Sequence, residues 1–480
     1  MKKIFLVLLA IVPFCVSGQS IYDVYNISTQ YYQGTAKSMA MGNAMGAVGQ
    51  DFSSISINPA GLGLFRKPTF TFTPSIITSY TKGELNGYQA VDSKAKLSVN
   101  NFGYVGINEA GNNVITWAVG MNRTNNFNNN IYIDSYNSES SLIDAYFIEM
   151  IENGISDDYM LQQYSPSYIY PLWQTYIINF DEIGLTTPIP LGEIRQQKGV
   201  NSWGGTNEWS ISTSINFSDK IFFGVSINMP YVYSRRFSQY KEQWTYENMP
   251  EEWMQEETLS TTGWGINGKL GIIAYPIKWL RLGASFHTPT VYDLTDIWKT
   301  QTASHLEGYT YEYFVPTSYF HYSMTTPLRA NASAAFIFGN FGMITADYEY
   351  VNYSSIRLSS YDYNYNDYNE VLSDIFSSTM NVRLGTEWRY QSFCFRGGYS
   401  FYGSPYGITD KDYRRNAISC GLGYTHHLFT IDFAYVFATQ QHQYNLYSQY
   451  TSYYDMLPPN DVTERDNFHN IVVTLKFRLY

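Results

Sequence analysis

The stretch SISINPAGLGLFRKPTFTF, residues 54–72, contains the point at which the sheet of this protein begins. An Asn-Pro-Ala-Gly turn and further glycines come first, and a strict Thr/Phe alternation follows Pro68. Alternation with a period of two is typical of a β-strand with one apolar face. The segment before it is too rich in glycine for a long helix and too apolar for a free tail. We therefore expect a separate structural part to precede the first strand.

The beginning of the chain, residues 1–18, has the pattern of a secretory signal peptide. Two lysines precede an apolar run from Ile4 to Val16, and the small residues Val-Ser-Gly end at Gly18. A basic start, a short apolar run and a small-residue cleavage site direct export, and this run is too short to span a bilayer. We predict that the mature chain is exported and begins after Gly18.

The composition favours a membrane β-barrel over a soluble domain. The chain is 18% aromatic, with 46 Tyr, and only 15% charged, whereas soluble proteins carry about 25% charged residues. After the signal peptide, no run of about 18 apolar residues is long enough for a transmembrane helix. These features fit a barrel with an apolar outer face and a polar lumen. The net charge of −11 argues against a nucleic-acid partner, which requires a basic patch.

Fourteen segments of the chain read as strands of one antiparallel barrel over residues 68–480. They span residues 68–81, 95–107, 113–125, 206–217, 221–236, 258–275, 279–298, 319–338, 341–357, 378–390, 392–403, 415–426, 428–442 and 466–480. Short connections alternate with long ones, which are expected near 82–94, 126–205, 237–257, 299–318, 358–377, 404–414 and 443–465. Short periplasmic turns and long external loops are typical of transmembrane barrels. We predict a bacterial outer-membrane protein with both termini in the periplasm.

Alternation within the strands assigns their faces. In FTIDFAYVF, Phe429, Ile431 and Phe433 share one parity and Thr430 and Asp432 the other. The apolar set should face lipid, because a charged side chain there costs a few kcal/mol at the bilayer midplane. The same rule puts the two mature cysteines, Cys394 and Cys420, on opposite faces, so we expect no disulfide between them.

Two of the external segments have features of their own. Within the long external loop 126–205, SSLIDAYFIEMIENG reads as a helix that Ser140 or Ser141 caps and Gly154 ends. That helix either packs on neighbouring loops or offers an apolar surface to a ligand. The acidic segment 241–257 is expected to be a solvated loop, with a divalent-cation site as the alternative.

Residues 19–67 resemble the N-terminal hatch of the FadL/TodX family of outer-membrane transporters. The match runs from Gly34 through Gly42 and Asp51 to the Asn58-Pro59-Ala60 turn, and the Phe-alternating first strand follows. Two barrel segments, FHTPTVYDL (286–294) and the stretch 324–354, are also similar to this family. The external loops show no such similarity. The resemblance implies a fourteen-stranded barrel whose lumen is filled by the hatch.

The resemblance also implies a function and a set of gating residues. The family takes up hydrophobic small molecules such as long-chain fatty acids and aromatic hydrocarbons. Gly42, Asp51 and the turn Asn58, Pro59 and Ala60 would form the hatch that gates the lumen. In the family this turn lies near a kink in the third strand that opens the wall to lipid. Gly120 and Asn122 in the strand VITWAVGMNRTNNF are the matching candidates here, with an ordinary strand end as the alternative.

Strand parity places eight basic and four acidic side chains towards the lumen. A basic excess suits an anionic headgroup such as a carboxylate, which arginine binds with paired N–H donors. The candidates for that contact are Arg281, Arg329, Arg383 and Arg396. The alternative is that these charges pair across neighbouring strands and stiffen the wall.

No enzyme motif stands out, since neither G-x-S-x-G nor H-E-x-x-H occurs. We expect no enzymatic activity, no cofactor and no metal site. The leading hypothesis is passive uptake of a hydrophobic small molecule, with outer-membrane lipid as a partner and the barrel assembly machinery required during biogenesis. A structural or adhesive barrel that acts through its Tyr-rich external loops is the alternative, and an outer-membrane lipase is a third class.

Overall fold

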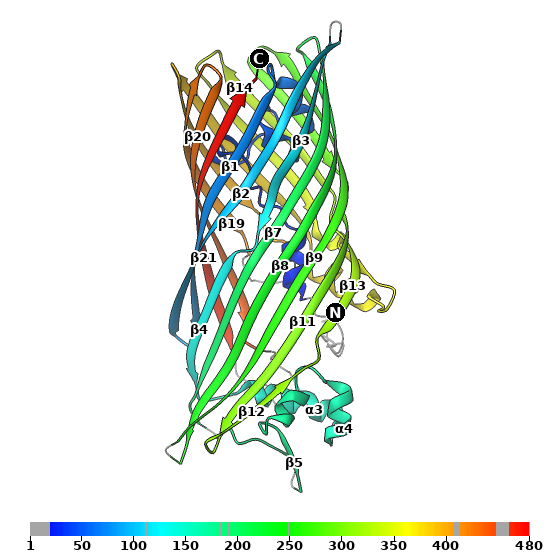
Figure 1. The fold of residues 1–480 in the computed structure, drawn as a ribbon, viewed down its shortest axis with the longest axis vertical. Helices are drawn as coiled ribbons and strands as arrows, with labels where there is room; N and C mark the ends of the chain where they lie inside the picture. Colours follow the sequence, from blue (N-terminus) through cyan, green and yellow to red (C-terminus); the bar gives the residue numbers. More distant parts are fainter. Residues whose placement is uncertain are drawn as a thin grey trace, which may run out of the picture.

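The computed structural model describes residues 20–479, apart from 111–112, 183, 191, 248, 408–412 and 448–459. The predicted signal peptide lies outside the described residues. The strands form one tall, closed barrel in which the N-terminal segment, drawn in dark blue, lies inside (Figure 1).

The barrel wall consists of fourteen antiparallel strands, as the sequence predicted. They are β1 (Thr69–Leu85), β2 (Tyr88–Ala110), β3 (Asn113–Asn126), β7 (Ile194–Phe217), β8 (Ile221–Tyr246), β9 (Met249–Ile277), β10 (Leu280–His287), β14 (Arg329–Phe338), β15 (Gly342–Asn352), β17 (Ser378–Tyr390), β18 (Phe393–Tyr402), β19 (Arg415–His426), β20 (Phe429–Asn445) and β21 (Asp461–Arg478). Each strand pairs with the next in this order, and β21 pairs with β1 and closes the wall. Outward positions such as Ile431 and Phe433 are exposed, while Thr430 and Asp432 are buried, which confirms the predicted parity.

Several wall strands continue beyond a break. The additional segments are β4 (Asn129–Asn137), β11 (Val291–Leu306), β12 (Tyr309–Phe314), β13 (Ser318–Thr325) and β16 (Arg357–Ser359). The predicted strand 279–298 divides into β10 and β11, and 319–338 divides into β13 and β14. Pro289 and Pro327 lie in these two breaks, and a proline has no N–H to donate to the ladder.

Three of the expected long loops are instead the ends of long β-hairpins. Strands β1 and β2 meet at Asn86-Gly87, and β11 and β12 meet at Glu307-Gly308, all four with positive φ. Strand β8 runs to Tyr246 and β9 starts at Met249, so only two residues separate them. The expectation of loops at 82–94, 237–257 and 299–318 was therefore wrong. Asn-Gly, here Asn86-Gly87, is a strong hairpin-turn signal.

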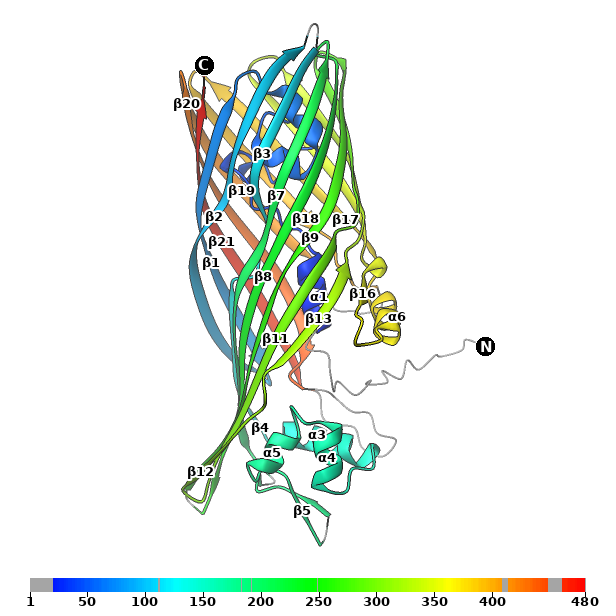
Figure 2. The same ribbon diagram turned by 45° about the vertical axis from the view of Figure 1, so that its right-hand side comes forward.

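The external loop 126–205 is not a single irregular loop. Its ends form β4, which pairs with the first part of β7. Between them lies a helical subdomain of α3 (Leu142–Glu152), α4 (Asp158–Tyr164), α5 (Tyr170–Gln174), β5 (Asn179–Asp181) and β6 (Gly184–Thr186), at the end of the barrel opposite the C-terminus (Figure 2). Helix α3 begins after Ser141, whose hydroxyl and Asp144 form a capping box, and Gly154 follows its end with a φ of 67°.

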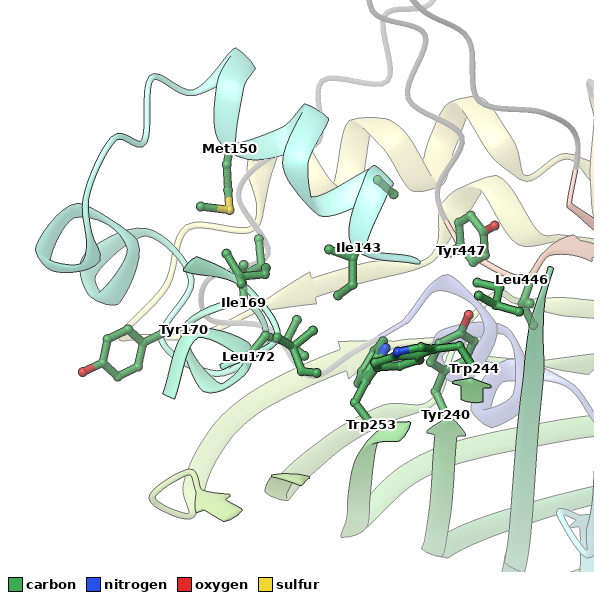
Figure 3. Close-up of a cluster of buried hydrophobic side chains, with 14 of the residues drawn as sticks. Ile143, Met150, Ile169, Tyr170, Leu172, Tyr240, Trp244, Trp253, Leu446 and Tyr447 are labelled. Atoms are coloured by element: carbon green, nitrogen blue, oxygen red, sulfur yellow. The ribbon is translucent and has the colours of Figure 1, made fainter. Parts of the chain in front are cut away.

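This helical subdomain has an apolar core shared with the long hairpins (Figure 3). Ile143 and Met150 of α3 pack towards Leu172 and the indoles of Trp244 and Trp253. The predicted helix therefore packs on its neighbours. The remaining helix outside the hatch, α6 (Asn366–Ile375), lies in the Tyr-rich external segment and is yellow in Figure 2.

The acidic segment 241–257 is folded into this region rather than being a solvated loop. Glu242 is fully buried and accepts five hydrogen bonds. The donors are Ser141 Oγ at 2.6 Å, Tyr240 OH at 2.7 Å, Trp253 Nε1 at 2.9 Å, Leu142 N at 3.0 Å and Gln196 Nε2 at 3.0 Å. These donors satisfy the carboxylate without a cation. Among the described residues, no cluster of three or more His, Cys, Asp or Glu side chains is arranged to hold a metal ion.

Candidate functional site

The hatch is a chain of short helical turns inside the barrel. It contains α1 (Ile21–Ser28), α2 (Ala36–Ala40), η1 (Phe52–Ser56) and η2 (Pro59–Leu64), and almost all of its residues from 31 to 65 are buried. Helix α1 lies in the half of the barrel near the long hairpins, and the other turns lie nearer the C-terminal end (Figure 2). The described N-terminal segment thus lies in the lumen. Strand β21 ends with Arg478 at the end of the barrel where short turns join the strands, which we call the short-turn end.

Asn58 fastens the hatch to the wall. Its Oδ1 accepts the backbone N–H of Ala60 at 3.1 Å and caps η2, in which Pro59 is the first residue. Its Nδ2 donates to the carbonyl oxygens of Gly46, Ile272 and Ala284 at 2.7, 3.1 and 3.4 Å. One side chain therefore joins two parts of the hatch to β9 and β10.

Asp51 is a second anchor of the hatch. It caps η1 by accepting the N–H of Ser53 at 3.0 Å, and it also accepts the hydroxyl of Thr35 at 2.6 Å. Its other oxygen lies 2.7 Å from Lys476 Nζ on β21. Asp51 is 1% exposed, so its charge is neutralised by an ion pair that ties the hatch to the strand at which the barrel closes.

Pairs of glycines in the wall make room for the hatch. Gly103 and Gly120 are cross-strand partners, and a Cβ on either would overlap the ring of Phe52. Gly224 and Gly271 are also cross-strand partners, and a Cβ on either would overlap the hatch at the Asn58-Pro59-Ala60 turn.

A third such pair lies beneath Gly42. Gly385 and Gly398 are cross-strand partners, and a Cβ on Gly398 would lie 2.1 Å from Gly42 N. Gly42 itself has a φ of 60°, and a Cβ there would lie 2.8 Å from the Tyr399 carbonyl oxygen. The hatch can approach the wall this closely only because both surfaces lack side chains.

The four candidate headgroup arginines already have partners in the wall or in the hatch. Arg329 and Arg383 both lie 3.0 Å from the carboxylate of Glu349, and Arg329 also donates to Ser28 O at 2.7 Å. Arg281 donates to a hatch carbonyl, Val48 O, at 3.2 Å. The predicted alternative, pairing within the wall, describes Arg329 and Arg383, which are 3% and 0% exposed.

Arg396 is likewise paired with wall carboxylates. It lies 2.7 Å from Glu387 and 2.6 Å from Asp432. It differs from Arg329 and Arg383 in that it also borders a cavity at the short-turn end.

The wall has a gap on one side of β2. Pairing of β2 with β3 runs from Ala110 and Asn113 to Asn101 and Asn122, and there it ends. From Tyr88 to Asn100, β2 pairs only with β1 among the described residues, while β4 pairs with β7. We call this interruption the wall gap.

The gap begins at one of the two residues that the sequence indicated, Asn122, and not at Gly120. Gly120 lies in the regularly paired part of β3, and the irregularity in the pairing of β3 with β7 falls between Arg123 and Asn125. Asn122 is the last β3 residue paired with β2, and its Nδ2 donates to Ser56 Oγ of the hatch at 3.0 Å. The gap therefore begins at Asn122, and Gly120 provides space for Phe52.

Side chains and the hatch span the gap. The guanidinium of Arg123 donates to Ser98 Oγ on β2 at 2.6 Å and to Gly204 O on β7 at 2.5 Å. Its backbone carbonyl accepts the N–H of Gln33 in the hatch at 2.9 Å. Lys94 on β2 reaches across to β7, where it donates to Ser202 O at 2.8 Å. Sequence reasoning noted the break in alternation at Arg123 but had no signal for these long-range partners.

A lumen cavity of about 90 Å³ lies directly behind the gap. Its wall includes residues 125–129 at the junction of β3 and β4, together with α1 and parts of β8, β20 and β21. Asp23 of α1 pairs with Arg236 at 2.7 Å, and Asn125 Nδ2 donates to Asn26 O at 2.8 Å. Helix α1 thus lines the cavity and is held there by contacts to β8 and to the end of β3.

None of the helices in the described part of the chain has the length and apolar composition to span a bilayer. The closed antiparallel wall, its apolar outer face and the plug in its lumen define an outer-membrane β-barrel that contains a hatch.

Known structures share this fold. The chain resembles the P. putida toluene transporter TodX with a TM-score of 0.54 and 13% identity, over 93% of this chain and 98% of that chain. A Pseudomonas aeruginosa FadL homologue gives 0.55 and 11%, and the Ralstonia pickettii toluene transporter TbuX gives 0.50 and 14%, with the same coverage. Neither a protein-family model nor the sequence of a curated protein matches this chain. At such low identity the likeness concerns the fold, and it confirms the FadL/TodX-like architecture that the hatch motif predicted.

Proposed function

We propose that this protein takes up hydrophobic small molecules passively across the outer membrane and releases them sideways through the wall gap. The observation that carries the proposal is the end of β2–β3 pairing at Asn122, beyond which β4 lies against β2 without pairing with it among the described residues. The structures of similar fold are described as toluene transporters and a FadL homologue. The substrate class proposed is therefore long-chain fatty acids or aromatic hydrocarbons.

The outer surface beside the gap favours release into lipid. Leu97 and Val99, on the part of β2 that pairs with β1 alone, are 72% and 38% exposed and face outward. A hydrophobic compound that leaves there enters the hydrocarbon of the membrane instead of water, so its transfer needs no energy source. Outer-membrane lipid is then the receiving partner.

The size of the lumen cavity requires the hatch to move. A pocket for a drug-sized ligand measures about 300–1,000 Å³, and the cavity behind the gap measures about 90 Å³. Displacement of α1 would break the Asp23–Arg236 pair and enlarge it. Hatch gating through Asn58, Asp51 and Gly42 is part of this proposal.

A first contact for the ligand is proposed at the helical subdomain. Leu142, Ala145 and Tyr146 of α3 line a cavity of about 260 Å³ next to β8 and β9. Helix α3 thus packs on the core through one side and borders an open space with another. The open side is the surface that we propose for the ligand.

The lateral route can be tested by closing the gap covalently. The mature chain has two cysteines, so Cys394→Ser and Cys420→Ser provide a thiol-free background. Lys94→Cys with Asn201→Cys, joined by a short reducible bifunctional thiol reagent, would hold β2 against β7, because Lys94 Nζ lies 2.5 Å from Asn201 Oδ1. The matched control is Val119→Cys with Ile211→Cys, which are outward-facing partners on two strands already paired.

Cells that carry each pair would be given radiolabelled oleate, toluene and a small sugar. The proposal predicts that cross-linking at the gap stops uptake of oleate or toluene, that reductant restores it, and that the control pair has no effect. Uptake that continues through a fully cross-linked gap would exclude the lateral route. Passage of sugar as fast as oleate would indicate an ordinary porin.

The adhesive alternative has one structural feature in its favour, which is the folded helical subdomain outside the barrel. Replacement of residues 138–193 by a short Gly-Ser linker separates the two functions. Loss of cell adhesion with unchanged oleate uptake would support the alternative, and reduced uptake with unchanged adhesion would support transport.

A further inference from the structure

A second, larger cavity lies beneath the hatch at the short-turn end of the barrel. It measures about 470 Å³ and is lined by hatch residues and by the ends of β17, β18, β20 and β21. This volume is within the range of ligand pockets. In an outer-membrane barrel the short-turn end faces the periplasm, so this cavity opens on the opposite side of the hatch from the cavity behind the gap.

The lining of this cavity is strongly basic although the chain as a whole is acidic. Seven lysines and arginines line it, against the two carboxylates Glu387 and Asp432. Asp51 and Asp219 pair with two of these cations from outside the lining. Counting all four carboxylates still leaves an excess of three positive charges.

Both carboxylates in the lining already form ion pairs with arginine or lysine side chains. Glu387 is paired with Arg389 at 2.7 Å and with Arg396 at 2.7 Å. Asp432 is paired with Arg396 at 2.6 Å and with Lys476 at 3.2 Å. Neither carboxylate is therefore left to serve as the counter-ion of a further lysine.

Lys37 is the uncompensated cation deepest in this cavity. It belongs to α2 of the hatch, is 7% exposed and lines the cavity. Within the described part of the chain, its ammonium has no hydrogen-bond or ion-pair partner. Arg478 and Lys67 lie in the same lining and their side chains also have no such partner there. A buried charge without a counter-ion is unfavourable, so this arrangement favours an anion in the cavity.

We propose that this cavity is a binding site for a small oxyanion, a carboxylate or a phosphate, with Lys37 as its central contact and Arg478 at its edge. Such a ligand has two sources: a hydrophobic carboxylic acid that has passed the hatch, or a free phosphate-bearing molecule of the periplasm. The site does not depend on the lateral route, because it lies on the other side of the hatch.

Cys394 provides a native reporter for the site, because it lines the same cavity and is half-buried. The experiment uses the purified full-length mature protein with Cys420→Ser, so that Cys394 is its single thiol. Its reaction rate is measured with two methanethiosulfonates, one bearing a sulfonate and one a quaternary ammonium. The variants are Lys37→Met and Arg478→Gln, and the matched control is Lys278→Met, an exposed lysine outside the cavity at the same end.

The proposal predicts that the sulfonate reagent reacts about tenfold faster than the ammonium reagent, because a positive cavity concentrates anions. The ratio falls in Lys37→Met and Arg478→Gln and is unchanged in Lys278→Met. If Lys37→Met does not fold, Arg478→Gln and the parent protein still give the ratio. Equal rates for both reagents in the parent protein would overturn the proposal.

Protection of Cys394 then identifies the source of the anion. Inorganic phosphate and octanoate are added separately, with octanol as the uncharged analogue of octanoate. Protection by phosphate alone assigns the site to a free anion, and protection by octanoate alone assigns it to a carboxylic acid cargo. No protection by either, or equal protection by octanol, would overturn the site. Failure of oleate uptake with intact protection would refute the transport function and leave the site standing.

Discussion

The substitution Asn58→Ala should release the hatch without damaging the barrel. The variant loses the cap on η2, which is worth about 1 kcal/mol. It also removes the 2.7 Å hydrogen bond to the buried carbonyl oxygen of Gly46, and an unsatisfied buried acceptor costs about 1–3 kcal/mol. We expect docking of the hatch to weaken by about 2–4 kcal/mol, which corresponds to roughly 30- to 1,000-fold more undocked hatch.

Hydrogen–deuterium exchange measured by mass spectrometry tests this directly. Peptides within residues 42–66 should exchange faster in Asn58→Ala by a factor of this size, while wall peptides such as β15 and β17 should not change. Asn364→Ala, in an exposed external segment, is the matched control. A hatch that exchanges at the parent rate in Asn58→Ala would show that this side chain does not hold the hatch, and the hydrogen-bond reasoning would be refuted.

Three further predictions follow from particular contacts. Gly398→Ala should displace the hatch and let a small sugar through, because its Cβ would lie 2.1 Å from Gly42 N. The control is the neighbouring Gly397→Ala, whose Cβ would lie 3.7 Å from the nearest atom, so that the barrel should stay closed to sugar. Equal sugar leakage in the two variants would contradict the docking role of the glycine pairs. Glu242→Ala should cost the helical subdomain about 3 kcal/mol or more, because five buried donors lose their acceptor. Faster proteolysis between 138 and 193 and a red-shifted Trp253 emission measure that loss, with Glu256→Ala as control. Thiol titration of the unfolded mature chain without reductant should find both Cys394 and Cys420 free, and a single reactive thiol or none would contradict their opposite facing.

Some residues of the candidate site could be predicted from the sequence, but their partners could not. Asn58, Asp51 and Gly42 belong to a local motif, and their capping and turn geometry depends on neighbours a few residues away. The partners that give them a role, such as Lys476 for Asp51, lie hundreds of residues away. The lumen arginines were located correctly by parity, but parity cannot distinguish a ligand contact from the Glu349 ion pairs.

Gly120 and Arg123 show the same limit at the wall gap. A glycine within a strand is ambiguous, and here it makes room for Phe52 instead of bending the chain. The break in alternation near Arg123 was visible in the sequence. Its consequence, the end of pairing between β2 and β3, depends on where β2, β7 and the hatch lie, and none of these is local to Arg123.

The barrel could be predicted from the sequence, because period-two alternation and the positions of the short connections are local properties that indicate the strand faces and the number of strands. The glycine-rich segment before the wall, with its resemblance to a hatch, could be recognised in the same way. Where the wall opens, which charges are paired and which cavity keeps an uncompensated lysine became visible only in the folded chain. Those features depend on contacts between residues that are far apart in the sequence. Strand pairing, burial and charge balance are set by these contacts and cannot be read from a local pattern.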